Sequence, residues 1–429
     1  MAPHICSIVP PYLLRGIAEN SVNDESHRQV ALRSLQQRET YTAKRCDRFS
    51  ALARPRAARA QHPVQQQAIV PEFLLKHIAE SELVDAETRA RAAYDCEQIH
   101  KVTMAYKESL ASQRLDAEQQ PETSTTTATT ATPSVKPGFY RAVYDAKNKD
   151  DENELPGDLV RVEGQPAHTD AAVNEAFDNV GKVLDFYHQQ FAWKSIDNRN
   201  MHVLSSVHFG QDYENAFWDP DRMQMVFGDG HAFLYKFTGC IDVIGHELTH
   251  AITEHTAPLE YEGQPGALNE HVSDVFGIMA KQMLEDETAE KSDWLIGEGC
   301  LLPDVKGVAL RSMKNPGTAY DDPRFGKDPQ PDHMDGYKRG TTEDNGGVHM
   351  FSGIPNRAFY LAAVAFGGYS WEKAGQVWWK TMNSGRVPPR CTFIQFADVT
   401  TEVAEELFGD EGAKIVRAAW TEVGVVRKH

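Results

Sequence analysis

Apolar residues recur at helical spacing through most of the second half of the chain. Six segments show this pattern, which is typical of helices that bury one face: 241–257, 268–286, 352–366, 371–383, 392–408 and 410–423. Upstream, residues 173–191 have a comparable pattern, with Phe177, Val180, Val183, Leu184 and Tyr187 on one face. Segments 202–210 and 223–230 instead read as strands bounded by turn residues. The order predicts an α+β fold in which a β-rich lobe at 139–241 precedes an α-helical lobe at 242–429, with a cleft between the lobes.

The N-terminal region contains the same short pattern twice. Residues 8–19 read IVPPYLLRGIAE and residues 69–80 read IVPEFLLKHIAE. In both, a proline opens a short amphipathic helix, predicted at 10–17 and 71–78. Residues 118–138 are rich in Thr, Ser and Pro and predict a linker. We therefore expect a separate helical region at 1–117.

The composition of the chain limits which binding partners and which cellular compartment we expect. The chain has 429 residues and a net charge of −18, which argues against nucleic acid or an anionic membrane as a partner. It contains no apolar run long enough to span a membrane and no signal-peptide pattern. Six cysteines are scattered without close spacing, which favours a reducing compartment. We expect a cytoplasmic protein, with leaderless export left open.

The helical segment 241–257 contains the motif His246-Glu247-Leu248-Thr249-His250. Residues four apart share one face of a helix, so both imidazoles can bind one metal ion. Glu247 lies beside them, where it can polarise a water molecule. Two histidines on an ordinary helix are the alternative interpretation.

The next predicted helix supplies a third ligand. Glu270 lies twenty positions after His250, and Asp274 follows one turn later. His-His-Glu is a standard ligand set of catalytic zinc, which keeps a fourth position open. Asp274 would accept a hydrogen bond from one imidazole and orient it. The alternative is a solvent-facing acidic helix.

With these residues the sequence resembles the thermolysin family of zinc endopeptidases. The resemblance runs from about Val143 to the C-terminus through short blocks in the family's order. The blocks are YENAFW at 213–218, GDG at 228–230, HELTH, GALNEHVSD at 266–274, DWLIGE at 293–298, LRSM at 310–313, PDH at 331–333 and DNGGVH at 344–349. It implies a two-lobed catalytic domain whose zinc-binding helix lies in the cleft.

The resemblance also implies roles for single residues. His349 and Tyr261 would stabilise the oxyanion of the tetrahedral intermediate, with Asp344 orienting His349. Glu247 would act as general base, and Asn269 would join Asp274 behind the ligands. The substrate main chain would be held by Arg311, Asn215 and Ala216. The residue after the scissile bond would enter a pocket lined by Leu234, Phe237, Val243 and Leu310. All four are apolar, so we expect cleavage on the N-terminal side of bulky hydrophobic residues.

The sequence departs from the family at its calcium sites. Asp242, Asp293 and Glu298 are retained, but Lys281 stands where the family has a bridging glutamate. Leu295 and Val308 replace two further acidic residues. Calcium binding is therefore possible but its ligand set is depleted. Our hypothesis is that Lys281 pairs with Asp293 or Glu298 in place of the ion.

The N-terminal region resembles the propeptide of the protealysin branch of this family. The shared motif is Pro10, Pro11, Tyr12, Leu13 and Leu14. The resemblance implies that this segment belongs to the chain's own propeptide, which covers the active site until it is removed. Our hypothesis is a latent precursor in which one or both copies of the motif pack against the catalytic domain, with the maturation cut in the 118–138 linker. A non-enzymatic protein-binding relative and a zinc aminopeptidase are the alternative functions. The physiological substrate, the oligomeric state, the maturation trigger and the role of the second motif stay open.

Overall fold

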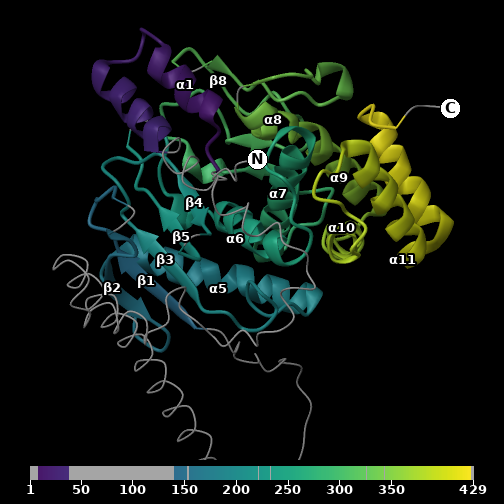
Figure 1. Ribbon diagram of the computed structural model, residues 1–429, viewed down its shortest axis with the longest axis horizontal. Coiled ribbons are helices and arrows are strands. Elements are labelled where there is room, and N and C mark those ends of the chain that lie inside the picture. The colour runs from purple at the N-terminus through teal and green to yellow at the C-terminus, as the bar shows by residue number, and fades with distance from the viewer. Residues whose placement is uncertain are drawn as a thin grey trace, which may run out of the picture.

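A computed structural model describes residues 8–37 and most of 140–426, without 152–153, 221, 232, 325 and 343. The predictions made for residues 1–7 and 38–139 lie outside the described residues. They include the 118–138 linker and the second propeptide-like segment at 71–78. Figure 1 shows the N-terminal segment, drawn in purple, lying against the body formed by the later residues.

A five-stranded mixed sheet forms the N-terminal part of the body. Its strands are β1 (Arg141–Asp145), β2 (Asp158–Val162), β3 (Val203–Val207), β4 (Ala216–Asp219) and β5 (Gln224–Phe227). They lie in the order β2-β1-β3-β5-β4. The three inner strands are parallel and the two edge strands are antiparallel to their neighbours. The strands predicted at 202–210 and 223–230 are confirmed, and β3 and β5 form the central parts of these two ranges.

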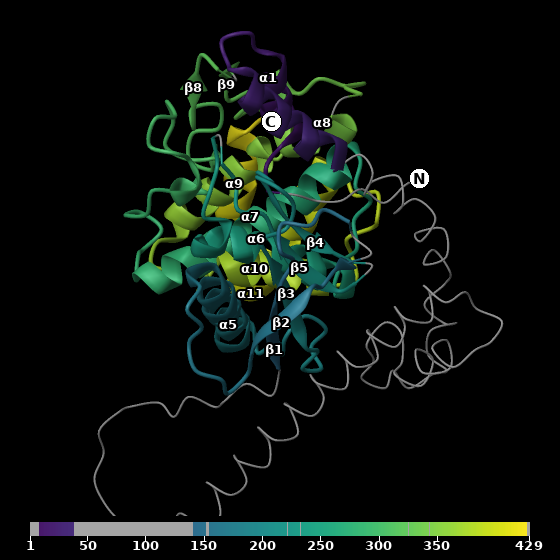
Figure 2. The ribbon, with the colours of Figure 1, turned by 90° about the vertical axis from the view of Figure 1, so that its left-hand side faces the viewer.

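The predicted helix at 173–191 is confirmed as α5 (Ala171–Phe191). It packs against β1 and β3, as Figure 2 shows, and its five predicted apolar residues are buried. The side chain of Asp170 accepts a hydrogen bond from the Ala172 N–H and caps the helix. Burial of this apolar face accounts for the periodicity in the sequence.

The second part of the body is helical, as predicted. Its helices are α6 (Ile241–His255), α7 (Gly263–Glu285), α8 (Asp344–Phe351), α9 (Gly353–Phe366), α10 (Ala374–Asn383) and α11 (Phe393–Glu422). The two helices predicted at 392–408 and 410–423 are joined in α11, where Gly409 has non-helical angles (φ 67°, ψ −165°). Helix α7 begins earlier than predicted because its first turn is made of small and polar residues without apolar periodicity.

Two glycines allow α6 and α7 to approach closely. A Cβ atom on Gly245 would lie 2.8 Å from the Cα of Gly277, and one on Gly277 would lie 2.5 Å from the carbonyl oxygen of Asp242. Neither contact is sterically possible for a larger residue without movement of a helix. The crossing therefore depends on glycine on both helices, and it sets how near the ligand-bearing residues of α6 and α7 can come.

Short elements connect these helices. They are the strands β6 (Leu295–Ile296), β7 (Arg311–Ser312), β8 (Asp321–Asp322) and β9 (Gly326–Lys327), and the 3₁₀ turns η3 (Phe237–Gly239), η4 (Glu298–Cys300) and η5 (Met334–Gly336). Strands β6 and β7 are antiparallel and pair Ile296 with Arg311. This pairing fixes the backbone of Arg311 beside the α7 side of the body.

The described N-terminal segment is helical. Helix α1 (Pro11–Glu19) has proline in its first turn, and residues 25–37 form further helix. Helix α1 buries Leu13, Leu14 and Ile17, which confirms the predicted apolar face. In both ribbon views it lies near β8 and α8 (Figures 1 and 2). The Nδ2 of Asn23 donates to the carbonyl oxygen of Arg324 at 2.6 Å, which ties the segment to the β8–β9 hairpin.

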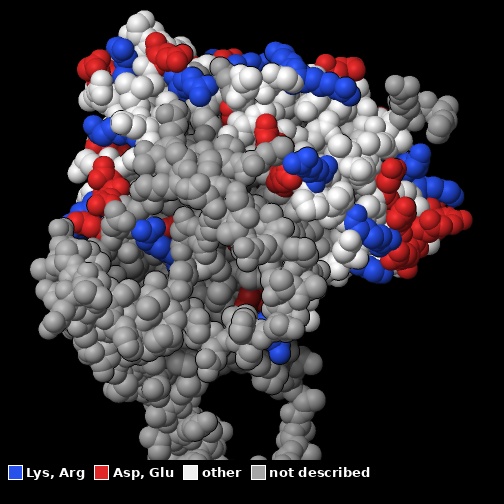
Figure 3. All heavy atoms as spheres, in the orientation of Figure 1, with Lys and Arg blue, Asp and Glu red and all other residues white. Residues whose placement is uncertain are grey.

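Charges of both signs are mixed where α11 faces solvent (Figure 3). Glu406 on this helix pairs with Lys380 at 3.0 Å and with Arg386 at 2.8 Å. Such exposed pairs stabilise a fold little, but they prevent this face from presenting a field of one sign.

Candidate active site

Three buried side chains from α6 and α7 face one another. The Nε2 atoms of His246 and His250 are 3.0 Å apart. Oε2 of Glu270 lies 3.4 Å from Nε2 of His246, and Oε1 lies 3.7 Å from Nε2 of His250. Among the residues that the structure describes, these three form the group able to hold a metal ion, with ligand atoms within 4.8 Å of one another.

This geometry fits zinc. In a tetrahedral site with bonds of about 2.0–2.2 Å, neighbouring ligand atoms lie about 3.3–3.6 Å apart. The three observed separations lie around that value. Two imidazoles and one carboxylate are the ligand types of a catalytic zinc ion, and they leave the fourth position for water or substrate.

Second hydrogen bonds orient both imidazoles. Nδ1 of His246 lies 2.8 Å from Oδ1 of Asp274, and Nδ1 of His250 lies 2.8 Å from Oδ1 of Asn269. The hydroxyl of Ser273 lies 2.9 Å from the same His250 nitrogen. Because Nδ1 is engaged in each ring, Nε2 of each ring is the nitrogen that would bind a metal ion. The structure thus places the predicted Asp274 and Asn269 behind the ligands and adds Ser273, which the sequence did not suggest.

Asp274 is also the centre of a wider polar network. Nε of Arg311 donates to its Oδ2 at 3.0 Å, Nη2 donates to its Oδ1 at 2.8 Å, and Nδ2 of Asn356 donates to Oδ2 at 2.8 Å. Burial alone would raise the pKa of Asp274, but Arg311 and His246 outweigh it and hold that pKa well below its usual range. Asp274 therefore carries a negative charge that both the metal ligand and the arginine use.

Glu247 is fully buried beside the ligands. Its Oε2 accepts a hydrogen bond from the backbone N–H of Trp218 in β4 at 3.0 Å. Burial raises the pKa of Glu247 to about 8, although His246 and the backbone of Trp218 and Ile8 oppose the rise. A carboxyl group with a raised pKa in this position is suited to accept and return a proton near neutral pH.

His349 and Tyr261 approach Glu270 from α8 and from the loop before α7. Nε2 of His349 lies 3.4 Å from Oε2 of Glu270 and 3.4 Å from the Tyr261 hydroxyl. The Tyr261 hydroxyl also donates to Oε1 of Glu270. Nδ1 of His349 lies 2.7 Å from Oδ1 of Asp344, as the resemblance implied.

The turn at Asp344–Gly347 explains how α8 positions His349. Asp344, Asn345, Gly346 and Gly347 all have positive φ, and a Cβ atom on Gly347 would lie 2.5 Å from the Phe351 ring. Glycine is therefore required at position 347. This left-handed turn lets Oδ2 of Asp344 accept from the His349 N–H at 2.9 Å as well, so one carboxylate holds both the backbone and the ring.

The segment before α1 lies against the predicted substrate-binding residues. Nη1 of Arg311 donates to the Ile8 carbonyl oxygen at 2.7 Å. Oδ1 of Asn215 accepts from the Val9 N–H at 3.0 Å, and its Nδ2 donates to the Val9 carbonyl oxygen at 3.3 Å. Backbone groups of the N-terminal segment therefore occupy the two side chains expected to hold a peptide substrate.

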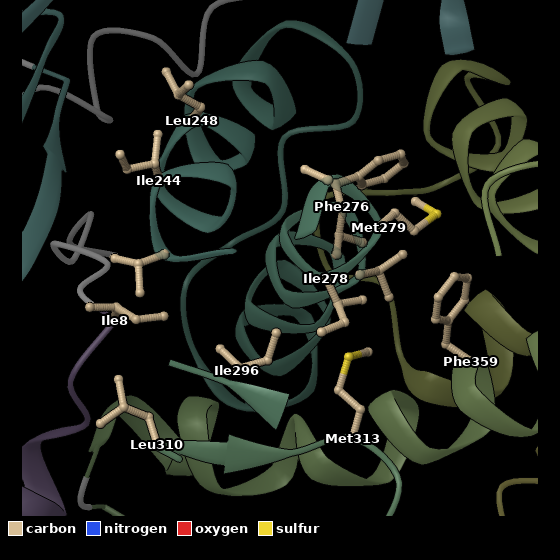
Figure 4. Packing of buried hydrophobic residues seen from close by; sticks show 14 of the residues in the cluster. Ile8, Ile244, Leu248, Phe276, Ile278, Met279, Ile296, Leu310, Met313 and Phe359 are labelled. Carbon is tan, nitrogen blue, oxygen red and sulfur yellow. The ribbon is translucent and has the colours of Figure 1, made fainter. Parts of the chain in front are cut away.

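The predicted apolar pocket residues are all buried: Leu234, Phe237, Val243 and Leu310. The Ala216 N–H is held by Oδ1 of its neighbour Asn215 at 3.0 Å. Figure 4 shows the Ile8 side chain on the same side as Ile244 of α6 and Leu310, and all three belong to one buried cluster.

The predicted propeptide motif continues this contact. The Pro10 carbonyl oxygen accepts from the Leu13 N–H at 3.1 Å, which starts α1, and Pro11 occupies the first helical position. Leu13 and Leu14 are buried. Tyr12 packs against the core, and burial raises the pKa of its hydroxyl well above the usual value. Contacts farther along the segment, such as that of Asn23 with Arg324, had no signal in the sequence.

Lys281 stands at the position where the sequence predicts that a lysine replaces the family's calcium ion. Its Nζ is 3.0 Å from Oδ2 of Asp293 and 3.0 Å from Oε2 of Glu298. Burial disfavours the charge on this lysine, but Asp242 and Asp293 outweigh burial and raise its pKa. The lysine contacts both candidate carboxylates rather than one of them.

A buried His-His-Glu set with a carboxylate beside it is typical of zinc-dependent hydrolases. Comparison with known proteins agrees. The family model described as "Thermolysin metallopeptidase, catalytic domain" matches residues 103–254, and the one described as "Thermolysin metallopeptidase, alpha-helical domain" matches residues 257–425. The chain belongs to the thermolysin family and is a zinc-dependent endopeptidase.

Individual relatives support the same assignment. The chain is 50% identical over 286 residues to an extracellular metalloprotease of Pectobacterium carotovorum, covering 66% of this chain and 81% of the relative. It is 46% identical over 289 residues to Protease PrtS of Photorhabdus, covering 67% and 76%. The solved precursor of protealysin from Serratia proteamaculans matches with a TM-score of 0.71 and 38% identity, over 98% of this chain and 100% of that one.

The expectation of a cytoplasmic protein is wrong. The relative from Pectobacterium is named an extracellular metalloprotease, whereas the expectation rested on a missing signal-peptide pattern and on scattered cysteines. Neither feature excludes export. Within the described residues, no helix has the length and apolarity needed to cross a membrane.

Proposed function

We propose that this endopeptidase cleaves peptide bonds through the residues around Glu247. His246, His250 and Glu270 would hold the zinc ion, which supplies a Lewis acid that makes water a better nucleophile. Glu247 takes a proton from the attacking water and returns it to the leaving amine. His349 and Tyr261 donate hydrogen bonds to the carbonyl oxygen as it gains charge. The observation that carries this proposal is the buried His-His-Glu set with Glu247 beside it.

The test is Glu247→Gln, which keeps the size of the side chain but removes its basicity. In chains from which the N-terminal region has been removed, we expect cleavage of an internally quenched peptide to fall by at least about 1,000-fold, while zinc content measured by mass spectrometry stays at one ion per chain. Leu248→Met, a volume-conserving change at the next position, is the control. Substantial activity in the glutamine variant would refute the role of Glu247.

The same assay separates the two alternative functions. An aminopeptidase would cleave a peptide with a free N-terminus and leave an N-acetylated peptide intact. A non-enzymatic relative would cleave neither peptide after its N-terminal region had been removed. We expect internal cleavage that does not depend on the peptide's N-terminus and that stops when a chelator is added.

We further propose cleavage on the N-terminal side of bulky hydrophobic residues. Ile8 supports this because its carbonyl oxygen binds Arg311, the residue that follows Leu310 of the predicted pocket in the chain, and because its apolar side chain is drawn on the same side as Leu310 in Figure 4. A substrate held in the same way would present its own apolar side chain at that position. Leu310→Asp should reduce kcat/KM for a peptide with leucine after the scissile bond, and a peptide with glycine there should be a poor substrate for the parent enzyme.

Latency of the full chain is a second proposal. The Ile8–Leu14 segment engages Arg311 and Asn215 and is buried, so a substrate cannot use the same two side chains. Leu14→Asp places a charge in a buried position at a cost of about 3 kcal/mol or more, which corresponds to about 100-fold weaker binding of the segment. The uncleaved precursor should then become active, as shown by peptide hydrolysis together with intact mass.

The second motif supplies a matched control. Leu75 occupies the position in 69–80 that Leu14 occupies in 8–19, so Leu75→Asp makes the same chemical change outside the described segment. We expect this variant to stay latent. Equal activation by both variants would mean that both segments inhibit the enzyme. Activation by Leu75→Asp alone would refute the proposal that the 8–19 segment inhibits it.

We also propose that Lys281 replaces a structural calcium ion. Its ammonium group lies 3.0 Å from both Asp293 and Glu298, and a cation there opposes the approach of a divalent ion. The Tm of the zinc-loaded chain should therefore change little between excess calcium and a calcium-selective chelator. By analogy with the Pectobacterium relative, we propose that the enzyme acts outside the cell. Detection in culture medium without a cytoplasmic marker tests this.

A further inference from the structure

Two cysteines far apart in the chain meet at the start of the zinc-binding helix. Cys240 is the residue before α6, and Cys300 ends the η4 turn. Their positions differ by 60, yet the Cys300 thiol donates to the sulfur of Cys240 with the two Sγ atoms 3.1 Å apart. Cys300 is buried and Cys240 is partly exposed. Cys391, the other cysteine within the described residues, is buried without a cysteine beside it.

The backbone around the pair is held on both sides. The Cys300 N–H donates to Gly297 at 3.1 Å, and its carbonyl oxygen accepts from the Tyr235 N–H at 3.0 Å. Oδ2 of Asp242, two residues after Cys240, accepts from the Gly297 N–H at 2.6 Å. These bonds hold the start of α6 against η4. To form a bond, the two sulfurs must close from 3.1 Å to about 2.05 Å.

We propose that Cys240 and Cys300 are a disulfide-forming pair that covalently ties the start of the zinc-binding helix to η4. The oxidant is a small disulfide such as glutathione disulfide. Cys240, the accessible thiol, loses its proton and attacks that disulfide, which releases one glutathione and leaves a mixed disulfide. Cys300 then displaces the second glutathione and its proton goes to the leaving thiolate. Two thiols are oxidised and one disulfide is reduced to two thiols.

The bond would act at the place where the family's calcium ligands are depleted. Glu298, in the same η4 turn as Cys300, pairs with Lys281 of α7. A covalent link between α6 and η4 limits the separation of these elements in the unfolded chain. For a closed loop of about 60 residues in a domain of about 290, the entropy estimate corresponds to a rise in Tm of about 5–7 °C.

The experiment uses the full chain carrying Glu247→Gln, which prevents self-digestion. One sample is incubated with glutathione disulfide and another with dithiothreitol, and both are alkylated under denaturing conditions. Peptide mapping should find Cys240 linked to Cys300 in the first sample and both alkylated in the second. The Tm should be higher in the oxidised sample, and it should fall back to the value of the reduced sample when dithiothreitol is added.

Two variants show which thiols are responsible. Cys240→Ala and Cys300→Ala should each abolish the linked peptide and the reversible Tm shift, whereas Cys391→Ala should keep both. A stable glutathione adduct on Cys240, or two free thiols after oxidation, would overturn the proposal. A bond that forms without raising the Tm would overturn its stabilising role.

Discussion

Replacing Lys281 with methionine tests whether the lysine stabilises the fold at the position where the family binds calcium. The change keeps the length of the side chain but removes the charge that lies 3.0 Å from both Asp293 and Glu298. It also removes the cation that favours the ionised form of buried Asp242, whose pKa burial already raises. Three carboxylates would then face one another without a cation.

The size of the effect follows from the exposure of each partner. The Asp293 and Glu298 side chains are 35% and 52% exposed, so water screens both pairs and each contributes about 0.5 kcal/mol. Asp242 is only 3% exposed, and a buried charge that loses its compensating charge costs a few kcal/mol. Taking about 2–3 kcal/mol for Asp242, the sum is about 3–4 kcal/mol, which corresponds to a fall in Tm of about 5–7 °C for a domain of this size.

The assay is thermal and urea unfolding of the zinc-loaded Glu247→Gln chain, with and without calcium. Lys281→Met should lower the free energy of unfolding by the stated amount, and Lys281→Glu should make stability depend on calcium because four carboxylates then meet. Glu298→Gln is the control, because it removes only the more exposed pair. A loss below about 0.5 kcal/mol in Lys281→Met, or a parent chain whose Tm rises strongly with calcium, would refute this reasoning.

Three further perturbations test the helix crossing, the metal and a titrating histidine. Gly277→Ala places a Cβ atom 2.5 Å from the Asp242 carbonyl oxygen, so it should cost about 1–3 kcal/mol in unfolding free energy and weaken zinc binding measured by chelator competition. Removing zinc should lower the Tm, because an ion that binds only the folded chain stabilises it, and zinc rather than calcium should restore it. Hydrogen bonding to Asp229, reinforced by Asp170, raises the pKa of His208 to about 9. Protonated His208 should therefore stabilise the folded chain by about 1–2 kcal/mol after solvent screening. This contribution should be fully present below pH 6.5, the usual pKa of histidine, and should be lost as the pH rises through 9. His208→Gln should remove this pH dependence in unfolding experiments, and an unchanged profile would contradict the assignment.

Local pattern was enough to predict the ligand set. His246 and His250 lie on one face of a single helix, so their spacing in the sequence was sufficient to predict that both can bind one ion. The family resemblance was needed to predict Tyr261 and His349 as site residues. The carboxamide of Asn356 could not be anticipated, because it reaches Asp274 from 82 positions away. The same holds for Trp218, whose backbone N–H reaches Glu247 only because β4 packs beside α6. Such contacts arise from tertiary packing, which leaves no periodic trace in the sequence.

The two glycines at the helix crossing are a related case. Gly245 and Gly277 carry no chemistry, and in a helical segment each reads as a small loss of stability. Only the approach of α6 to α7 shows why a side chain is excluded at both positions. The sequence therefore identified the groups that bind, while the packing that brings them within 3–4 Å became visible in the structure.

Asp274 contacts both the imidazole of His246 and the guanidinium of Arg311, and Asp274→Asn tests both contacts. The amide keeps an acceptor for Nδ1 of His246 but removes the charge, and its NH₂ group would face the donors of Arg311. Zinc affinity should fall by about 10- to 100-fold, as is usual when the partner of a ligating histidine is lost. Arg311, fully buried and left without its carboxylate, should also hold the Ile8 carbonyl less firmly. The precursor should therefore lose latency when assayed at saturating zinc, and chelator competition measures the first effect independently. Wild-type zinc affinity together with full latency would show that the carboxylate serves neither function.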